Sequence, residues 1–135
     1  MRKINILLIL FLVFISAYGQ VNKKINKEYT GTYKSKDFKG CPISLIITSG
    51  SDGYHYKIKI KTREKEGRLK ILKEGSDVYL SFVGLIGKKP KKEVEGQING
   101  NSIVIQNYGN TMNEYLVFSE CNNTKYIELS KIISN

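Results

Sequence analysis

The chain has 135 residues and a mass of 15.4 kDa, which is enough for one domain and too little for two. Its 22 Lys and Arg residues exceed its 12 Asp and Glu residues by ten, and its apolar content of 41% is that of a globular protein. A single His and two Cys exclude most zinc and iron–sulfur centres, so the sequence predicts neither a metal nor a cofactor.

The first nineteen residues have the pattern of a secretory signal peptide. A basic start, Met1-Arg2-Lys3, precedes a nearly unbroken apolar run over residues 4–16, and Ala17-Tyr18-Gly19 places small residues where a signal peptidase reads them. The apolar run is shorter than the ~20 residues that a membrane-spanning helix needs, although an uncleaved membrane anchor is the alternative. We therefore expect residues 1–19 to be removed and residues 20–135 to form a single secreted or periplasmic domain.

After this leader the chain shows short segments in which apolar and polar residues alternate. Strands send successive side chains to opposite faces, so alternation with a period of two predicts strands that have one dry and one wet face. Nine segments fit, with varying clarity, and in chain order they are residues 28–35, 43–48, 54–63, 68–73, 78–83, 93–98, 102–106, 115–118 and 125–129. Turn residues separate several of them, at residues 49–53, 66–67, 74–76 and 99–101.

Short turns join antiparallel neighbours, so the pattern predicts an all-β, up-and-down meander of about eight or nine strands. Closure into an antiparallel β-barrel removes the exposed edges of such a meander, and a two-sheet β-sandwich is the alternative. Cys41 lies near the start of the strand set and Cys121 near its end, and two lone cysteines in an exported protein usually bond to each other. Such a disulfide closes a loop of about 80 residues and stabilises the fold by roughly 4–5 kcal/mol.

The segment Tyr29-Thr30-Gly31-Thr32-Tyr33 resembles the opening strand of the calycin barrels, which include lipocalins, fatty-acid-binding proteins and avidins. These barrels carry a Gly-x-Trp motif, and Tyr33 stands here where the family has Trp. In the family the Trp closes the barrel floor and a basic residue of the last strand covers it, a role that the resemblance implies for Lys125 or Lys131. The resemblance covers five residues and the strand count, and it implies a barrel that holds a small apolar ligand.

Eight tyrosines follow the leader, and several fall on predicted inward faces. Tyrosines that line a small barrel contact an amphipathic ligand through their rings and hydroxyls, whereas ordinary core packing is the alternative. The candidate ligand-binding residues are Tyr33, Tyr54, Tyr56, Tyr79 and Tyr115, and Tyr108 is a further inward candidate.

Basic residues gather in two places and predict a possible anion-binding surface. The first is a stripe on one face of residues 54–63, and a turn at residues 64–67 would add two more cations to it: Lys57, Lys59, Lys61, Arg63, Arg68 and Lys70. The second is a cationic loop that holds Lys88, Lys89, Lys91 and Lys92. Like charges on adjacent strands destabilise a sheet, which favours a use such as binding lipid headgroups or a polyanionic glycan. A solvated surface is the alternative, and export argues against specific nucleic-acid recognition.

The sequence offers little catalytic chemistry. The only histidine, His55, falls on the lysine-bearing face, and the carboxylate pairs Glu64/Glu66 and Glu93/Glu95 lie beside basic residues as in a charge-balanced surface. We therefore expect a non-catalytic binding protein of the lipocalin-like type, with a small apolar or amphipathic ligand in the barrel. The alternative is a cell-envelope interaction protein that docks a polyanion, a lipid headgroup or another protein through its basic outer face.

Overall fold

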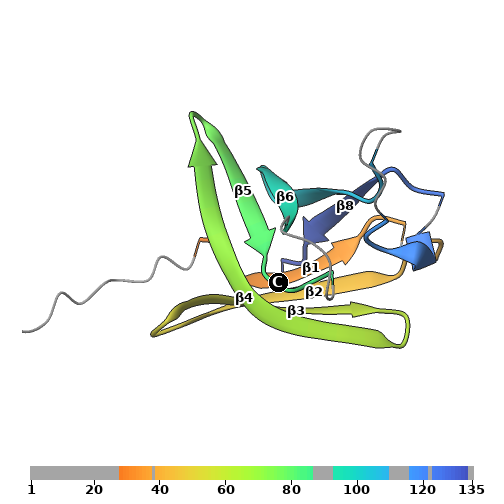
Figure 1. Cartoon of the computed structure of the whole chain (residues 1–135), viewed down its shortest axis with the longest axis horizontal. Coiled ribbons are helices and arrows are strands. Elements are labelled where there is room, and N and C mark those ends of the chain that lie inside the picture. The colour runs from red at the N-terminus through yellow and green to blue at the C-terminus, as the bar shows by residue number, and fades with distance from the viewer. Residues whose placement is uncertain (1–27, 38, 87–92, 110–115, 122, 134–135) are drawn as a thin grey trace, which may run out of the picture.

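The computed structural model describes residues 28–37, 39–86, 93–109, 116–121 and 123–133, and these form a closed barrel of eight antiparallel strands (Figure 1). Each strand pairs with the next one along the chain, and the first pairs with the last. The strands are β1 Gly31–Ser35, β2 Ile43–Gly50, β3 Gly53–Ile60, β4 Arg63–Glu74, β5 Asp77–Phe82, β6 Val94–Asn99, β7 Ser102–Gln106 and β8 Tyr126–Lys131. The predicted all-β, up-and-down barrel is confirmed, and the sandwich alternative is wrong.

Eight of the nine predicted strands are present, and the segment 115–118 is not one of them. Within its described part, Leu116 makes an isolated bridge to Tyr108, and a 3-10 helix, η2 Ser119–Cys121, follows. No helix among the described residues is long and apolar enough to cross a membrane. The predicted leader, residues 1–19, lies outside the described residues.

The sequence predicts the turn between β3 and β4 at residues 64–67, and this position is wrong. The chain reverses at Lys61-Thr62, where Lys61 takes a positive φ of 51°, and β4 then runs without interruption through residues 66–67. Gly67 provides room rather than a turn, because a Cβ there would lie 3.0 Å from the Tyr56 ring and 2.6 Å from the Val83 carbonyl oxygen. The glycine therefore allows the Tyr56 side chain to cross β4.

The barrel interior is filled by apolar side chains from every strand. The largest fully buried side chains are those of Phe82, Phe118, Ile43, Leu45, Ile47, Ile58, Ile60, Leu80, Ile103, Ile105, Ile127 and Leu129. Packing is close around Gly96, where an added Cβ would lie 2.7 Å from Ile103 Cγ2 and 3.1 Å from Ile105 Cγ1. Burial of these side chains supplies the main driving force for folding.

The antiparallel order gives the barrel two different ends. At one, which we call the hairpin end, lie three tight hairpins, the start of β1 and the end of β8. At the other, the cap end, lie the β1–β2 loop, the β3–β4 turn and the long connection from β7 to β8. Figure 1 shows the β4–β5 hairpin extending well beyond the rest of the barrel at the hairpin end.

Candidate functional site

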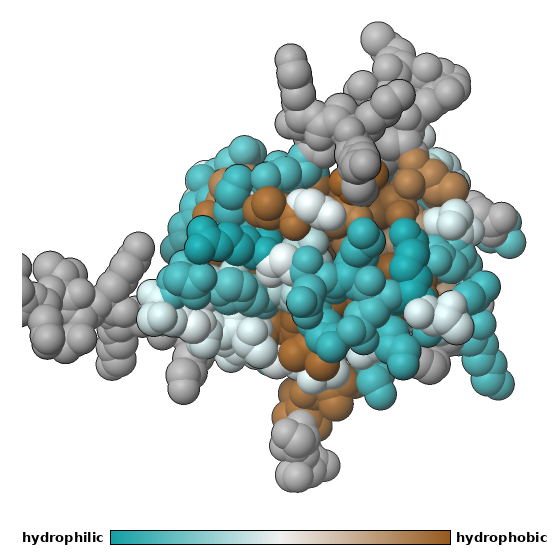
Figure 2. All heavy atoms as spheres, turned by 60° about the horizontal axis from the view of Figure 1, so that its bottom comes forward, coloured by the Kyte–Doolittle hydropathy of each residue, from teal (hydrophilic) through white to brown (hydrophobic). Residues whose placement is uncertain are grey.

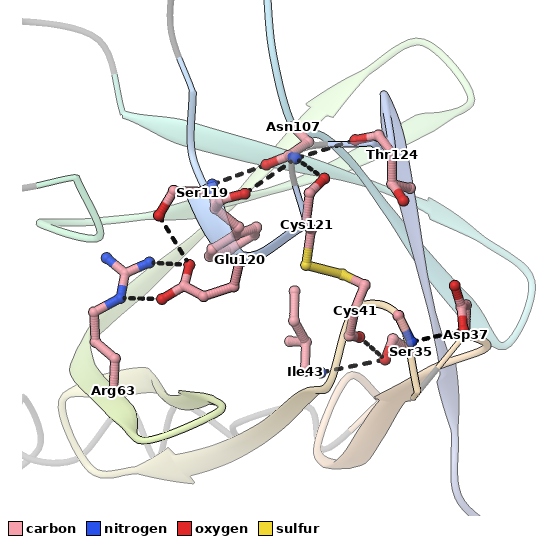
Figure 3. The surroundings of a disulfide bond; sticks show 12 residues. Ser35, Asp37, Cys41, Ile43, Arg63, Asn107, Ser119, Glu120, Cys121 and Thr124 are labelled. Atoms are coloured by element: carbon pink, nitrogen blue, oxygen red, sulfur yellow. Dashed lines mark hydrogen bonds and ion pairs between the residues drawn. A yellow bond between two sulfur atoms is a disulfide. The ribbon is translucent and has the colours of Figure 1, made fainter.

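The cap end is held together by the predicted disulfide (Figure 3). Cys41 of the β1–β2 loop bonds to Cys121 of η2, across 80 residues of sequence, and both residues are buried. The disulfide therefore ties the chain after its first strand to the chain before its last strand, as the sequence predicts.

The segment around Cys121, residues 116–121 and 123–125, closes this end of the barrel, and we call it the cap. Asn107 organises the cap. The buried side-chain amide of Asn107 donates to the carbonyl oxygens of Phe118, Cys121 and Thr124 at 3.2, 2.8 and 3.0 Å. Its amide oxygen accepts from the Phe118 backbone N–H at 2.8 Å. One side chain thus adds four hydrogen bonds to the few backbone pairings of this irregular segment.

Arg63 takes part in the cap rather than in an outer cationic stripe. Its Nε and NH2 groups donate to the two carboxylate oxygens of Glu120 at 3.0 and 2.9 Å, a bidentate pair (Figure 3). Burial acts to raise the pKa of Glu120, but the residue's own backbone N–H and the Arg63 guanidinium outweigh it and lower the pKa. Phe118 and Val117 of the cap are buried in the hydrophobic core, so the cap closes this end of the barrel with apolar side chains.

At the hairpin end, Tyr33 and Lys131 reproduce the contact that the sequence resemblance implied. The two residues are cross-strand partners in β1 and β8, and the Lys131 ammonium lies 5.7 Å from the centroid of the Tyr33 ring. Gly31 leaves room for this lysine, because a Cβ at that position would lie 2.7 Å from Lys131 Cε. The Tyr33 hydroxyl donates to the Tyr29 carbonyl oxygen at 2.9 Å, so Tyr33 is a satisfied structural residue.

Tyr54 differs from the other inward tyrosines because its hydroxyl is unsatisfied. The side chain lies opposite Leu69, with its ring 6.0 Å from that of Tyr29. Its hydroxyl oxygen is buried, and no hydrogen-bond partner for it exists among the residues that the structure describes. Burial raises the pKa of Tyr54 and the charge of Glu28 raises it further, so the hydroxyl stays protonated at neutral pH.

The remaining candidate tyrosines do not form a ligand-binding site together with Tyr54. Tyr56 points inward, but its hydroxyl already donates to the Val83 carbonyl oxygen at 2.9 Å. Tyr79 alternates with buried Leu80 and pairs with Leu72, which places it on the outer face of the barrel and makes its prediction as a lining residue wrong. Tyr115 lies outside the described residues.

The predicted cationic stripe is largely balanced by carboxylates. Because β4 begins at Arg63, the pairing sets Lys57 opposite Glu66 and Lys59 opposite Glu64, and Lys57 Nζ lies 2.8 Å from Glu64 Oε1. The predicted juxtaposition of Arg68 and Lys70 with Arg63 and Lys61 is therefore wrong. Figure 2, which brings the β2–β4 side of the barrel forward, shows hydrophilic side chains over the middle of this face with smaller hydrophobic areas around them.

Two more cations of the stripe, Arg68 and Lys70, are also paired. Arg68 lies 3.2 Å from Asp52, and Lys70 lies 3.0 Å from Glu93. The described residues hold thirteen Lys and Arg against eleven Asp and Glu, so the described barrel is close to neutral. Much of the excess positive charge belongs to residues 20–27 and 88–92. The predicted cationic loop lies outside the described residues, and its lysines are Lys88, Lys89, Lys91 and Lys92.

His55 contacts Asp52, with its Nε2 2.9 Å from the carboxylate, at the exposed β2–β3 hairpin. The hydrogen bond to His55 is the main cause that lowers the pKa of Asp52. Among the described residues no group of three metal-ligating side chains comes together.

Comparison with protein-family models, with curated proteins and with solved structures gave no match.

Proposed function

We propose that the chain is an exported, non-catalytic binding protein of the calycin-like type that holds a small amphipathic ligand at the hairpin end. The observation that carries the proposal is the buried hydroxyl of Tyr54, which has no hydrogen-bond partner among the described residues. Leaving a buried hydroxyl without a partner costs about 1–3 kcal/mol, and a polar group of a bound molecule would remove that cost. The Gly31–Tyr33–Lys131 arrangement supports the calycin-like part of the proposal.

The surroundings of Tyr54 indicate the ligand chemistry. Tyr29 and Leu69 are apolar neighbours of the Tyr54 side chain, which suits an aromatic or aliphatic body. The negative charge of Glu28 acts on both Tyr29 and Tyr54, which favours a ligand that carries a hydrogen-bond donor or an amine. The middle of the barrel is closely packed, and the disulfide holds the cap over the opposite end. Both features favour a shallow site at the hairpin end over a deep cavity.

The proposal is tested with 1-aminoanthracene, a fluorescent probe that combines an apolar ring system with an amine. We expect saturable binding to the exported protein, and we expect Tyr54→Phe to weaken it about tenfold, because the loss of one buried hydrogen bond is worth about 1 kcal/mol or more. Tyr126→Phe is the matched control, because Tyr126 is 56% exposed. Equal binding by wild type and Tyr54→Phe would show that the hydroxyl does not contact the probe and would refute this site.

A second candidate function is supported by the packed interior and by the location of the charge. An envelope interaction protein would dock an anionic surface through the basic segments 20–27 and 88–92, which carry charge that the described barrel does not balance. We expect such a protein to bind vesicles that contain phosphatidylglycerol in low salt and to leave them as salt is raised. Replacing Lys88, Lys89, Lys91 and Lys92 by Gln should weaken this binding, whereas replacing Lys57 and Lys59 should not.

A further inference from the structure

The β4–β5 hairpin carries an exposed strand edge. β3 pairs with β4 only as far as Leu69, and β6 pairs with β5 only as far as Tyr79, so the hairpin projects beyond both neighbours (Figure 1). Residues 63–69 of β4 pair with β3. Among the described residues, residues 70–74 of β4 pair only with β5, and no strand lies on their other side. We call residues 70–74 the free edge.

Within the described part of the chain, the free edge presents four backbone groups that pair with no strand. The Val83 N–H donates to the Arg68 carbonyl oxygen at 3.1 Å, so Arg68 directs its backbone toward β5. Backbone groups alternate sides along an antiparallel ladder, which directs Lys70, Leu72 and Glu74 toward β5 as well. Ile71 and Lys73 then direct their N–H and C=O groups outward, where they form a template for another strand.

We propose that a second copy of this chain occupies the free edge and forms a two-fold symmetric dimer centred on Leu72. In an antiparallel arrangement about this axis, Ile71 of one copy lies opposite Lys73 of the other. Each such pair exchanges two hydrogen bonds, so the two symmetric pairs satisfy the outward groups of both copies. The two barrels would thereby share one continuous sheet.

The side chains fit the same register. Lys70, which contacts Glu93 in the single chain, becomes directly opposed to Glu74 of the other copy, and pairs of opposite charge across strands are stabilising. Leu72, 36% exposed in the single chain, meets Leu72 of the second copy, and Tyr79 lies beside each leucine as its cross-strand partner. The outer face thus gains an apolar row of four side chains, flanked on each side by an ion pair.

Neighbouring registers do not fit. A shift of one residue would oppose Ile71 to a residue whose backbone faces β5, so the hydrogen bonds are lost. A shift of two residues in one direction opposes Lys73 to Lys73. The same shift in the other direction opposes Lys73 to Leu69, which already pairs with Tyr54 of its own chain.

A cysteine cross-link tests the register. At the two-fold axis the Leu72 Cα atoms would lie about 4.5 Å apart, within the range that a disulfide spans. We expect the exported full-length product of Leu72→Cys to form a disulfide-linked dimer under oxidising conditions, and Lys73→Cys, with the same added thiol off the axis, not to. Equal cross-linking of both variants, or cross-linking of neither, would overturn the proposed register.

Sedimentation equilibrium tests the dimer itself. We expect the wild-type protein to dimerise with rising concentration, and Glu74→Lys to raise the dissociation constant about tenfold, because two attractive pairs become repulsive. Glu66→Lys, the same charge change on the same face of β4 but outside the free edge, should leave it unchanged. A wild-type protein that stays monomeric up to millimolar concentration would overturn the proposal. So would a dimer that forms only after residues 20–27 are removed, because that segment would then be the occupant of the edge.

Discussion

Replacing Asn107 by Ala removes the side chain that joins the cap to the barrel. The amide makes three donor contacts, to Phe118, Cys121 and Thr124, and one acceptor contact, and the side chain is fully buried. The substitution leaves the three carbonyl oxygens and one N–H without this partner, in a region that the disulfide keeps close to the barrel. We therefore expect a large loss of stability with the overall fold retained.

The size of the loss follows from the contacts. Each hydrogen bond contributes about 1 kcal/mol and the three donor contacts share two N–H groups, so the loss is about 3 kcal/mol. The unfolding entropy is about 2.1 cal/mol/K per residue, or about 0.24 kcal/mol/K for residues 20–135. A loss of about 3 kcal/mol then lowers the Tm by about 12 °C.

The assay is thermal unfolding followed by circular dichroism, with urea unfolding as a second measurement and with the disulfide intact in all samples. Asn123→Ala is the matched control, because Asn123 is an exposed asparagine of the same cap. We expect the control to change the unfolding free energy by less than about 0.5 kcal/mol. An Asn107→Ala protein within about 1 kcal/mol of wild type would refute the reasoning that one amide organises the cap.

Three further predictions concern packing, covalent linkage and pH. Gly96→Ala should destabilise the fold by about 1–3 kcal/mol in urea unfolding, because its Cβ would lie 2.7 Å from a core methyl group, whereas an unchanged midpoint would mean that the core relaxes freely. Replacing Cys41 and Cys121 together by Ser should cost about 4–5 kcal/mol, and calorimetry that finds less than about 2 kcal/mol would contradict the loop-closure argument. Glu120 has a lowered pKa in the folded state, so its contribution to stability is present above its unfolded pKa of about 4.3 and is lost as pH falls through the folded value. The stability difference between wild type and Arg63→Gln should therefore shrink between pH 5 and pH 3, and a difference that stays constant would contradict the ion pair.

Much of the fold is predictable because the hydrophobic pattern directly reflects burial. The alternation over residues 54–60 requires one wet and one dry face, and Tyr56, Ile58 and Ile60 are buried accordingly. The pairing of Cys41 with Cys121 follows from their being the only two cysteines of the chain. The resemblance implies that either Lys125 or Lys131 covers Tyr33, and the register of β1 with β8 places Lys131 there.

The errors have physical causes as well. Glu66-Gly67 has the composition of a turn, but Gly67 lies inside β4 because the Tyr56 ring needs the space of a missing Cβ, a tertiary requirement without a local signal. Tyr79 was assignable from the sequence, since it alternates with Leu80. Asn107 gave no signal, because its four contacts go to residues between eleven and seventeen positions away in an irregular segment.

Barrel closure depends on two strands that are about a hundred positions apart and share only three register pairs, Tyr33 with Lys131, Lys34 with Ser130 and Ser35 with Leu129. Ribosomes synthesise a chain from its amino terminus, so one edge of the first strand stays unpaired until the last strand has been made. Contacts so remote in sequence form late and slowly. The nascent polypeptide is thus most vulnerable to aggregation just before its final residues arrive, and a shortened carboxyl terminus would leave the sheet unclosed.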